Sequence, residues 1–338
     1  MYRIARPLYF PVTSDTVSYY PGINTVKASL ILLVIFAHSL PDGMIQYYNY
    51  FFEMPLFMAI SGFLIKETTF KYGLRKYLRY LTGRIFIPWL IAFIIYFPLQ
   101  LGTRSILQVS VNDFIYPFYH LWFIPAYTLG AISFYAIIRF KLQALPILII
   151  TGVINAFWYV YIRDSAIKDE LTQLQFLGDK RFYAYLFFFL LGVCLRNKRI
   201  NLRFSPAPLF FTLLSSFTII ALCIQSKVAD VLALLPYLFF NFSLAVFVLL
   251  YVAPLKIFQN EFMRFVNKNS LGIYLFHPMI VMGIYYFMGD SGKAHTSMFQ
   301  GFLVGVVTIM LIVTLVWALQ KWAVTNRYLL GNIKPKGE

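Results

Sequence analysis

Charged residues are scarce in this sequence, and acidic residues are the scarcest of them. Only 12% of the 338 residues are charged and only 13 are Asp or Glu, whereas a soluble domain carries about 25% charged residues. Hydrophobic residues make up 60% of the chain and aromatic residues 20%. This balance excludes an ordinary soluble domain, and it indicates an integral membrane protein.

Cysteine is nearly absent. Cys194 and Cys223 both fall inside apolar runs and have no partner spacing, so we predict neither a disulfide framework nor a metal site. The first twenty residues lack a continuous apolar segment and a small-residue cleavage site, so no cleaved signal peptide is predicted.

Long apolar runs dominate the rest of the chain. A helix needs about 20 apolar residues to cross the hydrocarbon layer, and backbone polar groups in lipid must be satisfied within the helix. We therefore predict an all-α, polytopic membrane bundle of about ten transmembrane helices. The predicted spans are 23–40, 46–65, 85–101, 118–138, 143–162, 182–195, 207–225, 231–252, 270–288 and 298–320.

The basic residues lie in short clusters between these spans and give the chain a net charge of +16. An amino terminus in the cytoplasm places most of the 29 Lys and Arg residues on the cytoplasmic side, as the positive-inside rule requires. We therefore predict that both termini and the linker 66–84 are cytoplasmic and that the loop 163–181 is external. The charge is read as topology, and no nucleic-acid partner is expected.

The first predicted span contains two ionisable residues, Lys27 and His38. An ionisable side chain at membrane depth costs about 2.5–3.5 kcal/mol on insertion scales, so it is seldom kept without a use. At about 1.5 Å per residue the two lie about 16 Å apart and cannot touch. This spacing suggests two separate contact points along one substrate path. The alternative is that Lys27 snorkels to the headgroups and His38 sits at the outer interface.

Glu53 lies about as far after the following turn as His38 lies before it. A histidine and a carboxylate at one depth can form a general base with its orienting partner. The alternative is that Glu53 pairs with another cation or lies exposed at the interface. Ser61–Phe63 supplies small residues for close helix packing, with a nucleophilic serine as the weaker interpretation.

Three further residues are candidates for the site. His120 and Trp122, in "FYHLWFIPAY", are expected near the depth of His38, although an aromatic belt alone explains the tryptophan. His277, in "NSLGIYLFHPMI", lies deep in its span directly before a proline. The basic linker either binds lipid headgroups or holds the phosphates of an anionic cofactor through Arg75, Arg79 and Arg84.

Four stretches in series, "INTVKASLILLVIFAHS", "FFEMPLFMAISGFLI", "HLWFIPAY" and "LGIYLFHP", resemble the membrane acyltransferase-3 family, and within it the fucose 4-O-acetylase-like branch. The resemblance covers almost the whole chain. It implies a domain at 23–324 between tails at 1–22 and 325–338.

The family motif in the first helix is an arginine, ten residues and a histidine, both important for activity, and Lys27 and His38 hold these positions. A lysine keeps the charge of the arginine but not its bidentate fork. Glu53 stands where the matching branch often has histidine, which leaves its role open.

The resemblance implies an O-acyltransferase, and more specifically an O-acetyltransferase. The donor would be acetyl-CoA or another acyl-CoA, bound as substrate near Lys27, Arg75, Arg79 and Arg84, and no resident cofactor is expected. The acceptor would be a hydroxyl of a surface or envelope glycan or lipid-linked saccharide, held near Trp122 and His277, with His38, Glu53 and His120 as the catalytic group. The expected location is the inner membrane of a bacterium.

Sequence alone leaves open whether His38 acts as a base or as an acyl carrier. A different class of function also remains open, because the same buried charges suit a transporter or flippase of a glycan or lipid-linked precursor.

Overall fold

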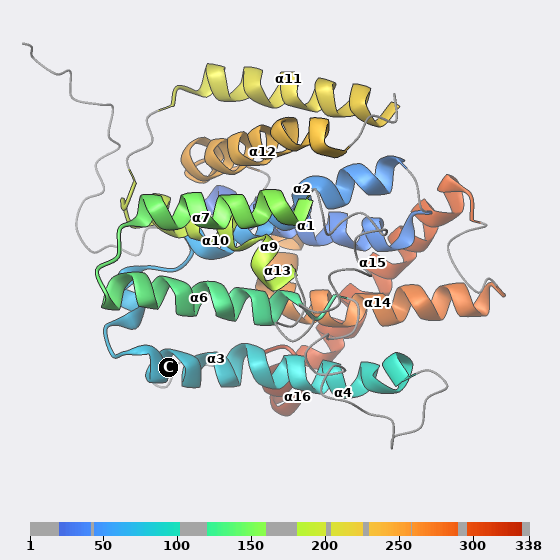
Figure 1. Ribbon diagram of the computed structural model, residues 1–338. Helices are drawn as coiled ribbons and strands as arrows, with labels where there is room; N and C mark the ends of the chain where they lie inside the picture. Colours follow the sequence, from blue (N-terminus) through green and yellow to red (C-terminus); the bar gives the residue numbers. More distant parts are fainter. Residues whose placement is uncertain are drawn as a thin grey trace, which may run out of the picture.

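The computed structural model describes residues 20–41, 44–101, 120–159, 181–200, 204–225, 230–257, 259–289 and 296–332, and within these ranges every regular element is a helix (Figure 1). The predicted all-helical membrane fold is confirmed. Six helical stretches in the described ranges are long and apolar enough to cross a membrane, namely Pro21–Ser39, Leu74–Leu99, Pro206–Cys223, Leu232–Val252, Ser270–Phe287 and Met298–Gln320. The chain is therefore a multi-pass membrane protein, while the number ten and the side on which the termini lie stay predictions.

Each predicted span overlaps a helix of the structure. These helices are α1 (Pro21–Ser39), α2 (Met44–Phe63), α4 (Ile87–Leu101), α6 (Phe123–Arg139), α7 (Ala144–Phe157), α10 (Leu186–Arg196), α11 (Pro206–Gln225), α12 (Asp230–Phe247), α14 (Ser270–Phe287) and α15 (Met298–Gln320). Shorter elements lie next to them: η1 (Glu67–Phe70), α3 (Leu74–Leu81), η2 (Thr82–Phe86), α9 (Arg181–Ala184), η6 (Val248–Val252), α13 (Glu261–Lys268) and α16 (Ala323–Tyr328).

Parts of the predicted tails and loops lie outside the described residues. These parts are residues 1–19 of the amino-terminal tail, 163–180 of the external loop and 333–338 of the carboxy-terminal tail. The domain boundaries at 22 and 324 stay predictions.

The predicted linker 66–84 is helical for most of its length, because α3 continues through the π-helical turn η2 into α4. The basic segment contains an amphipathic helix, α3. Tyr77 and Leu81, four residues apart, are buried, whereas Arg75 and Arg79, also four apart, are exposed. Residues at this spacing share one face of a helix, so the basic residues lie outside and the helix packs through its other side.

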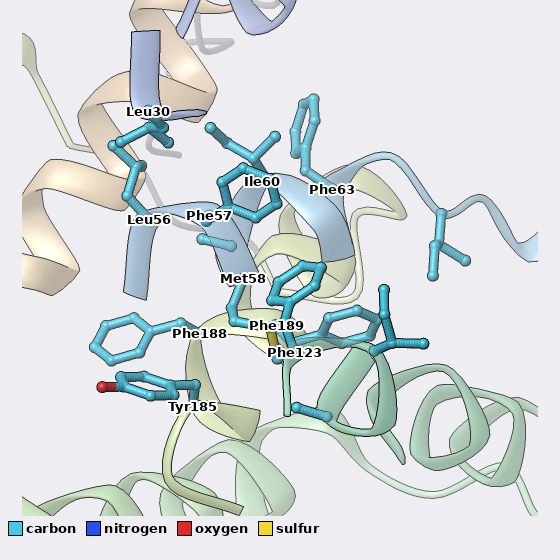
Figure 2. Close-up of a cluster of buried hydrophobic side chains, with 14 of the residues drawn as sticks. Leu30, Leu56, Phe57, Met58, Ile60, Phe63, Phe123, Tyr185, Phe188 and Phe189 are labelled. Atoms are coloured by element: carbon cyan, nitrogen blue, oxygen red, sulfur yellow. The ribbon is translucent and has the colours of Figure 1, made fainter. Parts of the chain in front are cut away.

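The core is centred on the contact between α2 and α10, where aromatic and aliphatic side chains of both helices interlock with α6 (Figure 2). Glycines allow the two backbones to approach closely. A Cβ added to Gly62 would lie 1.9 Å from the Phe189 carbonyl oxygen, and one added to Gly192 would lie 1.9 Å from the Ala59 oxygen. The predicted close approach at Ser61–Phe63 is thus confirmed.

The helices are arranged around α1. The pair α11 and α12 lies at one edge of the bundle and α3 with α4 at the opposite edge (Figure 1), while α1 contacts α2, α13, α14 and α15 between them. Hydrogen bonds connect α1 to the bundle near both of its ends. Thr25 donates a hydrogen bond to the Ile257 carbonyl (2.7 Å) near the start, and the Tyr285 hydroxyl donates to the Ser39 carbonyl at the end. The helix that carries Lys27 and His38 is therefore held in place by the surrounding bundle.

Candidate functional site

Lys27 and His38 lie on one face of α1. Eleven residues make just over three helical turns, so the two side chains point in nearly the same direction and are separated by about 16 Å along the axis. Lys27 is half-buried and His38 is 8% exposed. The helix therefore presents a cation and an imidazole to two different parts of the interior.

A cavity of about 600 Å³ opens at the Lys27 end of α1. Its wall is formed by α1, α2, α3 with η2, α6, the junction of α13 and α14, and residues 330–332. Three of its lining residues are basic, Lys27, Arg84 and Lys268, and none of the described residues that line it is acidic. A concave site with charge of one sign attracts the opposite charge, so this cavity is suited to an anion.

The same cavity also has hydroxyl-bearing and aromatic walls. Tyr77 of α3 and Tyr127 of α6 line it, and their hydroxyl groups form a hydrogen bond of 2.8 Å. Ser61 of α2 adds a further hydroxyl, and Phe57 and Phe123 supply apolar surface. The cavity therefore suits an anion that also has polar and apolar parts.

Three histidines from distant parts of the chain form a buried group, here called the histidine cluster. His38 is on α1, His120 precedes α6 and His277 is on α14, and they are 8%, 4% and 0% exposed. The ring centroids of His38 and His277 are 5.2 Å apart, and those of His120 and His277 are 5.7 Å apart. Within the described ranges, no group of His, Cys, Asp or Glu side chains has a metal-binding arrangement.

Backbone carbonyls determine which nitrogen of two of these rings carries a hydrogen. The Nδ1 atom of His277 lies 3.0 Å from the Ile273 oxygen, and the Nε2 atom of His120 lies 3.2 Å from the Leu275 oxygen. A carbonyl oxygen can only accept, so each of these nitrogens must donate. When His277 is neutral, its lone pair is therefore on Nε2, and this buried atom has no hydrogen-bond partner among the described residues.

Tyr274 joins the cavity to the histidine cluster. It lines the cavity, its ring centroid lies 5.2 Å from that of His120, and its hydroxyl donates to the His120 carbonyl oxygen. A ligand that fills the cavity therefore reaches, at Tyr274, a residue in direct contact with the histidine cluster.

Comparison with known proteins assigns this helical bundle to a family. Residues 20–320 match the family model described as "Acyltransferase domain", acyltransferase-3. The chain belongs to the acyltransferase-3 family. It is therefore a multi-pass membrane acyltransferase, and the group that it transfers is not an aminoacyl group.

A curated relative and the solved structures add little to the family assignment. A protein named "Amino-acid racemase" from Enterococcus faecalis is 25% identical over 197 residues, which cover 52% of this acyltransferase and 28% of the relative. Our chain thus spans just over a quarter of that relative's length, and the relative's named activity is not carried over to it. No solved structure matches the chain.

Glu53 does not form the predicted hydrogen-bonded pair with His38 in this acyltransferase. Its carboxylate is fully buried, and neither oxygen has a hydrogen-bond partner among the described residues. The ring that lies against His38 belongs instead to His277. Depth in two adjacent helices was the basis of the predicted dyad, and depth does not determine which way a side chain points.

The predicted donor-binding residues separate into two groups. Lys27 and Arg84 line the cavity, whereas Arg75 and Arg79 are exposed on α3 and are not among its lining residues. Helical geometry explains this, because Arg75 and Arg79 lie on the face of α3 opposite the buried one.

Trp122 lies in a packed aromatic group. Its ring stacks on that of Tyr185 at 5.4 Å, the Arg181 guanidinium lies 5.2 Å from its centroid, and it is only 5% exposed. It does not line the cavity. His277, predicted to bind substrate, lies in the histidine cluster together with the predicted catalytic residues His38 and His120, and its role stays a prediction.

Sequence reasoning missed Tyr274 and Lys268. Tyr274 precedes His277 by three residues in "IYLFHP", which places both on neighbouring positions of one helix face, and this signal was available. For Lys268 the sequence indicates only a role in topology, and no local pattern shows that α13 brings it to the cavity of α1.

Proposed function

We propose that this acyltransferase moves an acyl group from cytoplasmic acyl-CoA to a hydroxyl of a surface or envelope glycan. The acyl group that we propose is acetyl. The proposed location is the inner membrane of a bacterium, and the fucose 4-O-acetylase-like branch is the proposed relationship within the family. The family assignment supports the reaction class, and the donor and the acceptor are proposals.

The observation that carries the donor proposal is the composition of the cavity. Its basic lining, with no acidic residue among the described ones, suits the phosphates of coenzyme A. Its hydroxyl groups suit the polar arm of coenzyme A, and its aromatic side chains suit the adenine base. Its volume of about 600 Å³ is within the range of about 300–1,000 Å³ typical of small-molecule sites. Lys27, Arg84 and Lys268 are the proposed contacts of the phosphates.

The histidine cluster supports acyl transfer near Tyr274. In one route His38 accepts the proton of the acceptor hydroxyl, the oxygen attacks the thioester carbonyl, the carbon–sulfur bond breaks, and the proton passes to the leaving thiolate. In the other route a His38 nitrogen attacks the thioester and releases the thiol, and the acceptor hydroxyl then takes the acyl group from the imidazole. His120 and His277 lie where they can accept or donate hydrogen bonds during either route.

Glu53 and Trp122 have proposed roles at the edges of this reaction. Glu53 is a buried acceptor without a hydrogen-bond partner in the described structure, which suits a contact with a hydroxyl of a bound substrate. Trp122, with Arg181 over its ring, supports the acceptor side through packing.

The test is thioester turnover by the purified, reconstituted protein. Acetyl-CoA or succinyl-CoA is supplied with a glycan extract, free thiol is measured, and the glycan mass is compared between wild type and a deletion strain. A gain of one acyl unit per modified sugar, together with thiol release, is expected. A transporter or flippase would move a labelled saccharide across vesicles without thiol release, and that result would contradict the proposal.

The two chemical routes differ in a trapped intermediate. Donor alone is mixed with enzyme, and the protein mass is measured after rapid quenching. A mass gain of one acyl group that depends on His38 indicates the acyl-carrier route, and its absence with normal steady-state transfer indicates the base.

A further inference from the structure

Helix α14 contains a proline in its interior, Pro278. Proline has no backbone N–H, so the carbonyl four residues earlier, on Tyr274, loses its helical donor and the turn is weakened. This turn carries Leu275, whose carbonyl meets His120, and it also carries His277. The geometry of the turn therefore affects two members of the histidine cluster.

A hydroxyl from another helix fills this turn. Tyr96 of α4 is fully buried, and its hydroxyl donates to the Leu275 carbonyl at 2.9 Å and accepts from the Met279 N–H at 3.2 Å. Residues 275 and 279 are the two that would bond to each other in an uninterrupted helix. One side chain thus bridges the acceptor and the donor of the turn that includes Pro278.

The Leu275 carbonyl is shared. It accepts from the Tyr96 hydroxyl and also from the Nε2–H of His120, whose ring lies edge-on to that of Tyr96 with centroids 5.3 Å apart. The carbonyl has two lone pairs and can satisfy both donors. A change in the direction of this carbonyl would therefore change the hydrogen bond that the Nε2–H of His120 donates.

We propose that Tyr96 is a positioning residue for the histidine cluster. By bridging the turn at Pro278 it keeps the Leu275 carbonyl aimed at His120, which holds the neutral ring as the Nε2–H tautomer with its lone pair on Nδ1. The use of His120 in acyl transfer rests on the proposed function, whereas the effect of Tyr96 on the tautomer does not.

The first test reads the tautomer directly. The chain has four histidines, so the ¹⁵N spectrum of histidine-labelled full-length protein in nanodiscs is simple, and single His variants assign it. Wild type is expected to show His120 as the Nε2–H form, and Tyr96→Phe is expected to convert a large fraction to the other tautomer. Tyr237→Phe is the matched control, because Tyr237 is also buried but packs against Phe51. An unchanged His120 signal in Tyr96→Phe would overturn the proposal.

The second test reads catalysis. Small misplacements of a reacting group can cost about 100-fold in rate, so Tyr96→Phe should lower kcat about 10- to 100-fold with little change in KM for the donor. In a His120→Gln background the same change should cost less than about threefold. Equal losses in both backgrounds would show that Tyr96 does not act through His120.

A third variant tests the proposal if Tyr96→Phe does not fold. Pro278→Ala restores an N–H to the turn, lets the 275–279 hydrogen bond close, and should shift the His120 tautomer in the same way; an unchanged tautomer in folded Pro278→Ala would also contradict the proposal. If wild type releases no thiol from acyl-CoA, the proposed function fails, whereas the tautomer measurement still decides the role of Tyr96.

Discussion

The imidazole rings of His38 and His277 lie against each other, with centroids 5.2 Å apart and planes 29° from parallel. The two residues come from the first and one of the last helices of the chain, which meet only in the folded bundle. Because the Nδ1 atom of His277 is bound to the Ile273 carbonyl, this ring is fixed and supports His38 on one side. The proposed acyl-CoA donor would approach this pair of rings from the cavity, past Tyr274.

The first prediction concerns His38. General acid–base catalysis contributes about 10²- to 10⁴-fold in rate, so His38→Ala should lower acyl transfer by at least 100-fold, because no other group replaces the imidazole at that place. Donor binding, measured by calorimetry, should change little, since His38 is about 16 Å from Lys27 along the helix. Wild-type transfer by a folded His38→Ala protein would contradict this assignment.

The second prediction separates cavity cations from surface cations. Lys27→Ala and Arg84→Ala should each raise the KM for acyl-CoA about tenfold or more, because a hydrogen bond to a charged group contributes about 1.5–3 kcal/mol. Arg75→Ala and Arg79→Ala are matched controls that remove the same charge from exposed positions of the same region, and their KM should stay within about twofold of wild type. Equal effects at all four positions would show a general effect of surface charge.

The third prediction concerns Glu53. Its buried carboxylate has no hydrogen-bond partner among the described residues, and burying such a group is costly. Glu53→Gln keeps the shape and removes the charge, so the apparent Tm in detergent should rise while transfer falls less than in His38→Ala.

A double variant tests whether Glu53 acts with His38. If the two act as one unit, Glu53→Gln should cost little in a His38→Ala background. Losses that multiply would show that Glu53 serves a separate step, such as holding the acceptor.

The fourth prediction concerns helix packing. Gly62→Ala should lower the free energy of unfolding by about 1–3 kcal/mol, the usual cost of overpacking, because its Cβ would lie 1.9 Å from a backbone oxygen of α10. Gly283→Ala is the matched control, since Gly283 is also within a helix and nothing lies within 4 Å of its added Cβ. That variant should be neutral or slightly more stable in a thermal unfolding assay, and equal destabilisation by both would contradict the packing argument.

The fifth prediction concerns sidedness, which rests on the distribution of basic residues. In a background with both native cysteines replaced by alanine, a cysteine at position 75 should be protected from a membrane-impermeant reagent in intact cells, and one at position 170 should be labelled. The reverse pattern would invert the predicted topology.

The sequence predicts the helical fold well because continuous apolar runs admit few other structures in a bilayer. It also identifies Lys27, His38, His120 and His277, since ionisable residues stand out against apolar neighbours. It could not predict that His277 lies against His38, because that contact joins residues 239 positions apart through the packing of α1 on α14.

The helix within the linker 66–84 is a different case. Its high density of basic residues indicates only a segment outside the membrane, although their spacing on α3 leaves one face free to be buried. For Glu53, depth along the hairpin was predictable, but the direction of the side chain depends on the rotation of α2, which no local signal determines.

The continuity of α1 fixes the distance between the cavity and the histidine cluster. One continuous helix, hydrogen-bonded to the bundle near both ends, carries Lys27 of the cavity and His38 of the histidine cluster, so it separates them by about 16 Å along its axis. One residue inserted between them would lengthen this separation by about 1.5 Å and turn the histidine by about 100° away from its partner. Length and angle change together in a helix, so the number of residues between Lys27 and His38 sets the distance that the proposed donor has to span.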